Sequence, residues 1–178
     1  MKLHPDFNVQ WCRSILSSNI SNLVNGREVL LDPGSPISNS IFTQSLYSSS
    51  AIRAHLSFQR PTSEPDSIGP LEYCYLLSLG SGVDGKRARA HGGFNSLILN
   101  HLAGMTACEV FGSVTLAAAT MKVDYKAPID TPGVIFARGW AVARDGRKLW
   151  VRTDIEDAKG QLLARAKVLF IHQRPAVL

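Results

Sequence analysis

Residues 91–112, HGGFNSLILNHLAGMTACEVFG, decide the fold. Large apolar side chains recur through this stretch at helical spacing and extend around most of the helix circumference: Phe94, Leu97, Ile98, Leu102, Met105 and Cys108. Small residues occupy much of what remains: Ala103, Gly104 and Ala107. A helix that is apolar on most sides has to be buried. The sequence therefore predicts a central helix over residues 91–111, enclosed by the rest of the chain.

Downstream of this helix the pattern is that of β-strands separated by short turns. Residues 114–125 begin this pattern, and in residues 121–126 apolar and charged side chains alternate, which is typical of a half-buried strand. The dipeptides Asp145-Gly146 and Lys159-Gly160 predict tight turns between three further strands. Such short connections favour an antiparallel meander.

Upstream, the spacing of apolar residues predicts an amphipathic helix over residues 6–24, followed by a Pro/Gly/Ser-rich loop to residue 40. Residues 51–58 and 72–79 read as strands, and residues 80–90 as a flexible basic loop. One buried helix needs a sheet curved around it, which is an α+β architecture. We therefore predict a single domain over residues 1–178, with an N-terminal helix and loop over residues 1–40.

The charge balance favours anionic partners. The 178 residues include 19 Lys or Arg against 14 Asp or Glu, a net charge of +5. Nucleic acid, the phosphates of CoA and an acidic carrier protein would all suit such a surface. No nucleic-acid-binding motif and no interleaving of aromatic with basic residues accompanies the charge, so we expect no nucleic-acid partner.

The cysteines and the termini bear on compartment and metal binding. Cys12, Cys74 and Cys108 are odd in number and widely spaced, which argues against a disulfide framework and against a CxxC zinc site. The opening MKLHPDFN lacks the apolar core of a signal peptide. The longest apolar stretch, around residues 97–107, is interrupted by polar residues and is too short to cross a bilayer. We expect a cytoplasmic protein with no metal and no membrane span.

The arrangement resembles the hotdog-fold acyl-CoA thioesterase superfamily. The resemblance rests on three features: the HGG at residues 91–93 with the buried helix, KVDYKAPIDTPG at 122–133, and the hairpin-forming region 143–171. The stretches SSAIRAHLSFQRP at 49–61 and LLSLGSGVDG at 76–85 also resemble the variant found in filamentous fungi. The resemblance implies a curved antiparallel sheet wrapped around one central helix. It further implies a homodimer or homotetramer, and an acyl thioester substrate in which CoA or phosphopantetheine is part of the substrate rather than a cofactor.

The HGG motif has a physical rationale. Two glycines at a helix start let a substrate carbonyl approach free backbone N–H groups closely, and the helix dipole favours negative charge there. By resemblance, the amide of Gly92 or Gly93 would form the oxyanion hole. The alternative is that both glycines only permit a tight turn from loop to helix.

Two positions depart from the hydrolytic relatives. In those relatives the tenth residue counted from the HGG histidine is usually Asp or Glu, which serves as nucleophile or general base. In this chain the same position is Asn100. An amide is a poor base at neutral pH. Relatives often carry Ser or Thr seven residues before the DY tyrosine, where this chain has Ala118. Asn100 shares a helix stripe with Gly93 and Ser96, so we expect all three to face substrate. The alternative for Asn100 is a satisfied buried amide.

The other polar residues near the motif are weaker candidates. His91 could act as a base or could orient the loop. His101 points about 100° away from Asn100 around the helix, toward the core or a partner subunit. Ser96 has no sequence-adjacent partner to activate it. We expect Asp124 and Asp154, on polar strand faces, to be solvated.

A basic cluster precedes the motif. Lys86, Arg87 and Arg89 are placed to contact the phosphates of CoA or phosphopantetheine, although simple solvation is an equal alternative.

Three functions follow from these features. The first is an acyl-thioester hydrolase that uses the Gly92 and Gly93 amides, with Asn100 orienting the carbonyl or water. The second is a non-hydrolytic biosynthetic enzyme, performing a cyclisation, isomerisation, elimination or acyl transfer on a polyketide-like substrate of secondary metabolism. The third is a non-catalytic binder of acyl ligands. The resemblance favours the first, and the loss of the acid at residue 100 favours the others.

Overall fold

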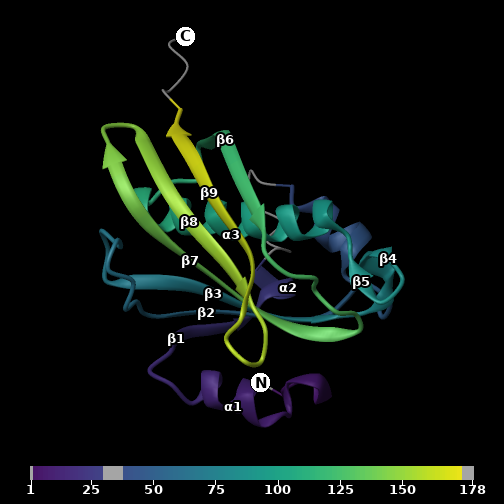
Figure 1. The fold of residues 1–178 in the computed structure, drawn as a ribbon. Helices are drawn as coiled ribbons and strands as arrows, with labels where there is room; N and C mark the ends of the chain where they lie inside the picture. The colour runs from purple at the N-terminus through teal and green to yellow at the C-terminus, as the bar shows by residue number, and fades with distance from the viewer. Residues whose placement is uncertain (1, 30–37, 174–178) are drawn as a thin grey trace.

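The computed structural model describes residues 2–29 and 38–173 and shows one curved sheet with a long helix lying across it (Figure 1). The sheet has seven strands in the order β1-β2-β3-β7-β8-β9-β6, and every neighbouring pair is antiparallel. Its strands are β1 (Ser21–Asn25), β2 (Ile52–Pro61), β3 (Leu71–Leu79), β6 (Leu116–Tyr125), β7 (Gly133–Asp145), β8 (Lys148–Glu156) and β9 (Leu162–His172). The predicted α+β architecture is confirmed.

The two predicted turns are confirmed. Gly146 and Gly160 both have positive φ (53° and 71°), a conformation that glycine adopts without strain, and they connect β7 to β8 and β8 to β9. The prediction of a four-strand meander is only partly right. The strands β7, β8 and β9 form a three-strand meander. Strand β6 pairs with β9 at the sheet edge, because the chain crosses the sheet between β6 and β7. That crossing leaves β6 as an edge strand.

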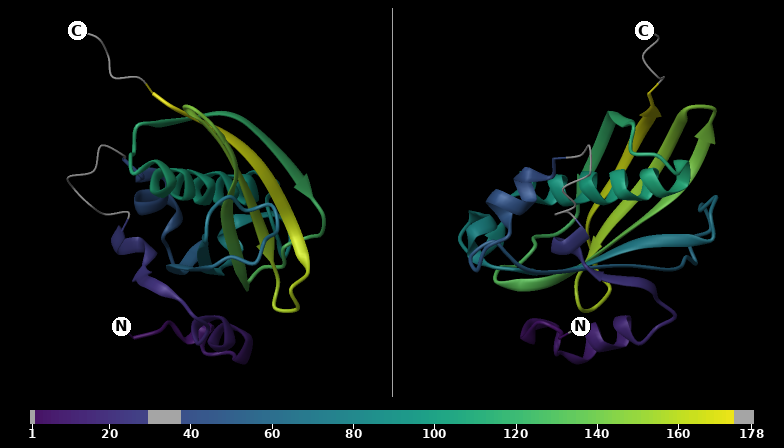
Figure 2. Two further views of the ribbon diagram at one scale, coloured as in Figure 1. Left: turned by 90° about the vertical axis from the view of Figure 1, so that its left-hand side faces the viewer. Right: turned by 180° about the vertical axis from the view of Figure 1, so that it is seen from behind.

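The central helix α3 (Gly92–Phe111) matches the predicted span, with His91 as its N-cap and Gly112, at φ 62°, as its C-cap. Its side chains Ile98, Leu99 and Leu102 are fully buried in the core that it shares with the concave face of the sheet. Figure 2 shows α3 along one side of the sheet and the N-terminal segment on the other. None of the helices in the described part of the chain is long and apolar enough to cross a membrane.

The prediction of one helix over residues 6–24 is wrong. This region instead contains a 3₁₀ turn, η1 (Pro5–Phe7), the short helix α1 (Gln10–Leu16) and the strand β1, which pairs with β2. The hydroxyls of Ser17 and Ser18 donate to carbonyls three residues back, which competes with continuing the helix. Phe7 and Cys12 from this segment pack on the outer face of the sheet.

The described residues between β1 and β2 include the short helix α2 (Gly26–Val29) and the π-helical segment η2 (Ile41–Leu46). Most of the loop predicted up to residue 40 lies outside the described residues.

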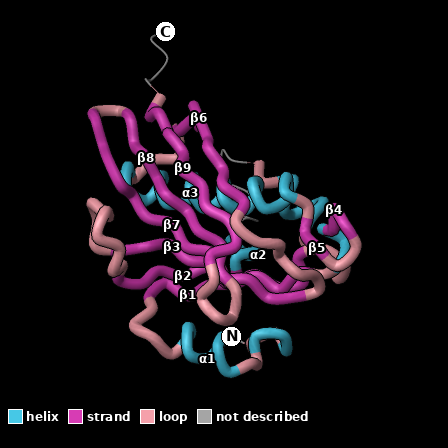
Figure 3. The backbone as a smooth tube through the Cα atoms, in the orientation of Figure 1, coloured by secondary structure: helices cyan, strands magenta, loops and turns pink. Residues whose placement is uncertain are grey.

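The basic stretch is more ordered than the predicted loop. It forms the 3₁₀ turn η3 (Ser81–Val83) and a small hairpin of β4 (Asp84–Lys86) and β5 (Arg89–Ala90). Figure 3 shows this hairpin at one end of the molecule, near the end of the long helix. Because β5 ends at Ala90 and α3 begins at Gly92, the hairpin fixes where the helix starts.

Asp154 is not solvated as predicted. Only 1% of it is exposed, and its Oδ1 accepts a hydrogen bond from Arg165 Nε at 2.7 Å. The sheet register explains the difference, because it places Arg138 on β7 and Arg165 on β9 directly beside Asp154 on β8. Asp124, which is partly exposed, lies 3.8 Å from Lys122.

Candidate active site at the start of the central helix

His91 closes the first turn of α3. Its Nδ1 accepts a hydrogen bond from the Gly93 N–H at 2.9 Å, and its backbone N–H donates to Val83 O at 2.8 Å. Gly85 in β4 makes room for this arrangement: a Cβ there would lie 2.7 Å from His91 Cδ2 and 2.9 Å from its Cα. The hairpin and the helix start are therefore packed together as one unit.

This hydrogen bond corrects two expectations. The Nδ1 lone pair of His91 is committed to Gly93, so the neutral ring carries its proton on Nε2 and is a donor rather than a base. The Gly93 N–H is likewise occupied and is not free to bind an oxyanion. Among the hydrogen bonds of the described residues, neither the Gly92 N–H nor the Phe94 N–H is a donor, and of these two residues Gly92 is the one that lines the cavity described next.

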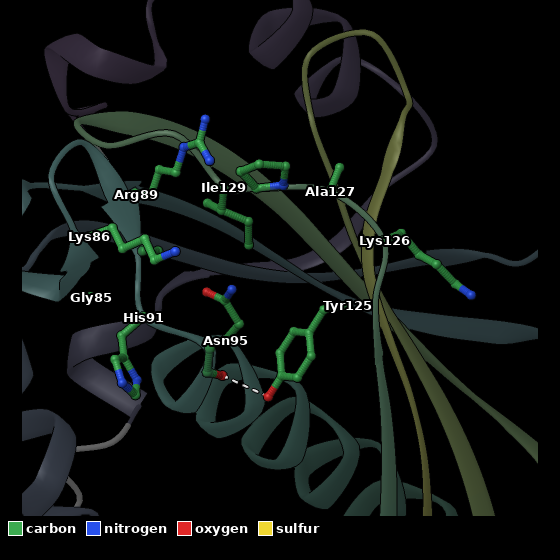
Figure 4. A pocket seen from close by; sticks show the side chains of 12 residues that line it. Gly85, Lys86, Arg89, His91, Asn95, Tyr125, Lys126, Ala127 and Ile129 are labelled. Carbon is green, nitrogen blue, oxygen red and sulfur yellow. Dashed lines mark hydrogen bonds between the residues drawn. The ribbon is translucent and has the colours of Figure 1, made fainter.

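A cavity of about 490 Å³, which we call the helix-end cavity, opens beside Gly92 (Figure 4). Its wall combines the hairpin, the first turn of α3 and the chain after β6: Gly85, Lys86, Arg89, Ala90, His91, Gly92, Asn95, Tyr125, Lys126, Ala127, Pro128 and Ile129. Lys86 and Arg89 of the predicted basic cluster are among the lining residues, whereas Arg87 is not, and their contact with phosphates stays a prediction. The cavity can offer cationic side chains and one backbone amide to the same ligand.

Tyr125, at the end of β6, fixes the other side of the helix start. Its hydroxyl donates to Gly92 O at 3.1 Å and lies 2.6 Å from Ser96 Oγ. Because the tyrosine proton goes to the carbonyl, Ser96 donates to the tyrosine oxygen. Ser96 therefore has a partner that its sequence neighbours do not reveal, and the pair forms a polar wall beside the cavity.

A second groove, which we call the Asn100 groove, has a volume of about 460 Å³ and lies between α3 and β6. Its lining comprises Gly93, Ser96, Leu97, Asn100, Ala118, Ala119, Thr120 and Met121. The predicted stripe of Gly93, Ser96 and Asn100 is confirmed, with Ala118 opposite. Asn100 is half-buried at this surface rather than enclosed in the core.

The predicted site is thus divided within one copy of the chain. Lys86, Arg89, His91 and Gly92 line the helix-end cavity, whereas Asn100 and Ala118 line the Asn100 groove. The first cavity lies between the hairpin and the start of α3, and the second lies between α3 and β6. Within residues 2–29 and 38–173, no Asp or Glu lines either space. The nearby Asp84 carboxylate is bound inside the hairpin region by Ala88 N–H and the Thr131 hydroxyl.

His101 faces the core, and the expectation of a catalytic role for it is wrong for this copy of the site. Its Nδ1 lies 3.0 Å from the Tyr75 hydroxyl, and its ring lies 4.2 Å from that of Phe42. Burial disfavours the charged imidazole and lowers the pKa of His101 to about 4, while burial raises the pKa of Tyr75 well above its usual value. A neutral histidine that is hydrogen-bonded to a buried tyrosine, and lines neither cavity, stabilises the core.

Tyr125 and Asn95 are among the residues of the helix-end cavity that the sequence did not single out. Tyr125 was visible in the DYKAP motif, but its contact with Gly92 depends on where β6 ends. Asn95 lies three residues after Gly92, one helical turn on, and this spacing was the available signal.

Comparisons with known proteins bear on the fold. No known family profile matches the chain, and no curated protein matches its sequence. Solved structures do match. One is a thioesterase superfamily protein with 23% identity and a TM-score of 0.54, in which the match covers 65% of this chain and 53% of the other. Another is AziG of S. sahachiroi, with 18% identity, coverages of 66% and 92%, and a TM-score of 0.54.

A third is the BH2602 protein from Bacillus halodurans, whose structure was determined with CoA. It has 18% identity, coverages of 55% and 65%, and a TM-score of 0.50. These likenesses show the fold, and the predicted hotdog architecture is confirmed. The matched region spans about half of the first of these proteins. The closer resemblance to the fungal variant stays a prediction.

Proposed function

We propose that this protein binds an acyl thioester of CoA or of a carrier protein at the start of α3 and acts on its carbonyl group. The observation that carries the proposal is that Gly92, whose N–H donates to no acceptor among the described residues, lines the same cavity as Lys86 and Arg89. The fold, which is that of thioesterase superfamily proteins, supports it, as does the CoA in the Bacillus halodurans structure.

In this proposal the Gly92 N–H donates to the thioester oxygen, and the dipole of α3 stabilises the charge that develops there. Lys86 and Arg89 hold the phosphates at the cavity edge. Hydrolysis would then require water to attack the carbonyl carbon. Asn100 cannot take the proton from that water, so its role is to orient the water or the carbonyl.

A second candidate function is favoured by the finding that no carboxylate of the described residues lines either space. A non-hydrolytic enzyme of secondary metabolism would use the Gly92 amide to stabilise the negative charge that develops on a carbonyl oxygen of a polyketide-like substrate during cyclisation, isomerisation, elimination or acyl transfer. Such a site has no need of a general base for water. A binder that leaves its ligand unchanged is the third possibility.

The proposal includes a homodimer built through β6, or a homotetramer made of two such dimers. β6 pairs only with β9 within the sheet, and its residues Ala118, Ala119 and Thr120 are small and exposed around a β-bulge. A second copy paired along this edge would close the Asn100 groove and complete the site. Light scattering at micromolar concentration tests this, and a single species of about 19 kDa, the mass of one chain, would contradict it.

The substrate is tested with a panel of acyl-CoA thioesters, measuring both hydrolysis and binding. Gly92→Ala is the diagnostic variant, because its Cβ would reach 3.4 Å from the Tyr125 ring without a clash and would crowd the cavity beside the amide. Gly104→Ala is the matched control on the same helix, where a Cβ meets only Phe170 at 3.7 Å.

We expect Gly92→Ala to lower kcat/KM at least about 10-fold, a modest effect beside outright loss of an oxyanion donor. If the protein only binds, the loss should appear in the dissociation constant instead. Gly104→Ala should leave both quantities unchanged. Equal behaviour of the two variants would place the carbonyl elsewhere.

A further inference from the structure

Asn95 is a buried polar side chain without a complete set of partners. It lies on α3, where its backbone N–H donates to His91 O at 3.1 Å, and only 5% of the residue is exposed. Its Oδ1 has no hydrogen-bond partner among the described residues. In Figure 4 its amide projects into the helix-end cavity, into the space between Lys86, Ile129 and Tyr125.

An orphaned buried oxygen destabilises a protein, and native structures contain few of them. Leucine has the same branched shape and would fill this position without that penalty. The neighbouring wall is apolar, since Ala90, Ala127 and Ile129 line the same cavity. An amide kept on a rigid helix at the wall of a cavity, beside apolar side chains, is suited to bind a ligand rather than to support the core.

We propose that Asn95 is a specificity-determining residue that hydrogen-bonds a hydroxyl or amide group of the substrate inside the helix-end cavity. The inference rests on the proposed function. Asn95 lies one helical turn beyond the Gly92 amide, so the recognised group is close to the thioester. That group belongs either to the acyl chain, as a hydroxyl, or to the pantetheine arm, as an amide N–H.

A hydroxyl or amide meets the needs of Asn95 in a way that an alkyl chain does not. An O–H or N–H donor pairs with Oδ1, and a hydroxyl can also accept from Nδ2 if the amide turns over. A purely alkyl group at this position would leave the oxygen buried and unpaired in the complex. Asn95 therefore discriminates between ligands mainly by rejecting those that lack the polar group.

The test measures binding of three compounds that cannot be hydrolysed: the S-butyl and S-(3-hydroxybutyl) thioethers of CoA, and desulfo-CoA. Dissociation constants are measured by calorimetry for the wild type, for Asn95→Leu, which keeps the shape, and for Asn95→Ala, which avoids any steric misfit. Thermal unfolding of each variant is the control for folding. We expect Asn95→Leu to be at least as stable as the wild type, because the orphaned oxygen is gone.

If the acyl chain carries the group, the wild type should bind the hydroxybutyl compound about 5- to 10-fold more tightly than the butyl compound, and both variants should lose that preference. If the pantetheine arm carries it, both variants should bind all three compounds more weakly by a similar factor. Either result supports the inference.

Unchanged affinities of both variants for all three compounds would overturn the inference while leaving the proposed function in place. A wild type that binds none of the three would overturn both the inference and the proposed CoA substrate.

Discussion

The N–H of Gly93 donates to the Nδ1 of His91 across 2.9 Å, and this single bond assigns a role to each residue of the HGG motif. It makes His91 the N-cap of α3 and removes Gly93 from the set of free amides. Gly92, whose N–H donates to no acceptor among the described residues, lines the helix-end cavity. The bond of Gly93 fits a role in the turn from loop to helix, and carbonyl binding by Gly92 stays a prediction.

The first prediction concerns the cap. His91→Ala should lower the free energy of unfolding by about 1 kcal/mol, the usual cost of losing an N-cap, whereas Asn at this position can cap in the same way. Urea denaturation of both variants measures the difference. We expect His91→Asn to recover turnover or binding together with stability, because His91 positions the helix start. A stable but inactive His91→Asn would instead assign chemistry to the imidazole.

The second prediction concerns Asn100. Asn100→Asp places a carboxylate in the groove with Gly93 and Ser96, where general-base assistance is typically worth about 10²–10⁴-fold. We expect a smaller rise in acyl-CoA hydrolysis, about 10-fold, because Ala118 still supplies no hydroxyl. A native reaction that needs a neutral amide should slow at the same time. Vigorous hydrolysis by the wild type that Asn100→Ala does not affect would move the chemistry away from this groove.

The third prediction separates the basic residues of the hairpin. Lys86 and Arg89 line the helix-end cavity and Arg87 does not. The double variant Lys86→Ala/Arg89→Ala should bind CoA about 10-fold more weakly at 0.1 M salt or below, and the difference should shrink toward about 1 M salt as the charges are screened. Arg87→Ala is the matched control and should bind as the wild type does. Equal salt dependence in all three proteins would show that the cluster is merely solvated.

The fourth prediction is a pH dependence of stability. Burial lowers the pKa of His101 from 6.5 to about 4. Burial also lowers the pKa of His55 to about 3, and the nearby charge of His101 adds to this shift. The unfolded chain therefore takes up protons first as the pH falls, and stability is lost from about pH 6.5 downward, toward the folded-state values.

His101 alone should account for roughly 2 kcal/mol between about pH 6.5 and pH 5. Denaturant titrations of the wild type and of His101→Gln at both pH values measure its share. The variant starts less stable because the contacts with Tyr75 and Phe42 are lost, but its stability should change less with pH. Parallel pH profiles would contradict the assignment of a neutral, buried His101.

The elements that could be predicted from the sequence are those with local causes. The helix over residues 91–111 follows from an apolar pattern that only burial can accommodate. The turns at Gly146 and Gly160 follow from dipeptides that adopt positive φ easily. The failed helix over residues 6–24 had the same kind of pattern. There, pairing of residues 21–25 with β2 outweighed a weak helical preference.

The sequence by itself determined the central helix, the strands that follow it and the residues able to bind a thioester near the HGG motif. Only the tertiary structure decided how those residues are grouped. The crossing that sends β6 to the sheet edge brings Tyr125 to Gly92 and places Ala118 opposite Asn100, and the β4–β5 hairpin brings Lys86 to the helix start. These contacts join residues that are distant in the chain. Successive residues of a helix differ by about 100° in direction, so two neighbouring glycines can line different cavities, as Gly92 and Gly93 do. The position of the glycines in the sequence could not show which cavity each one lines.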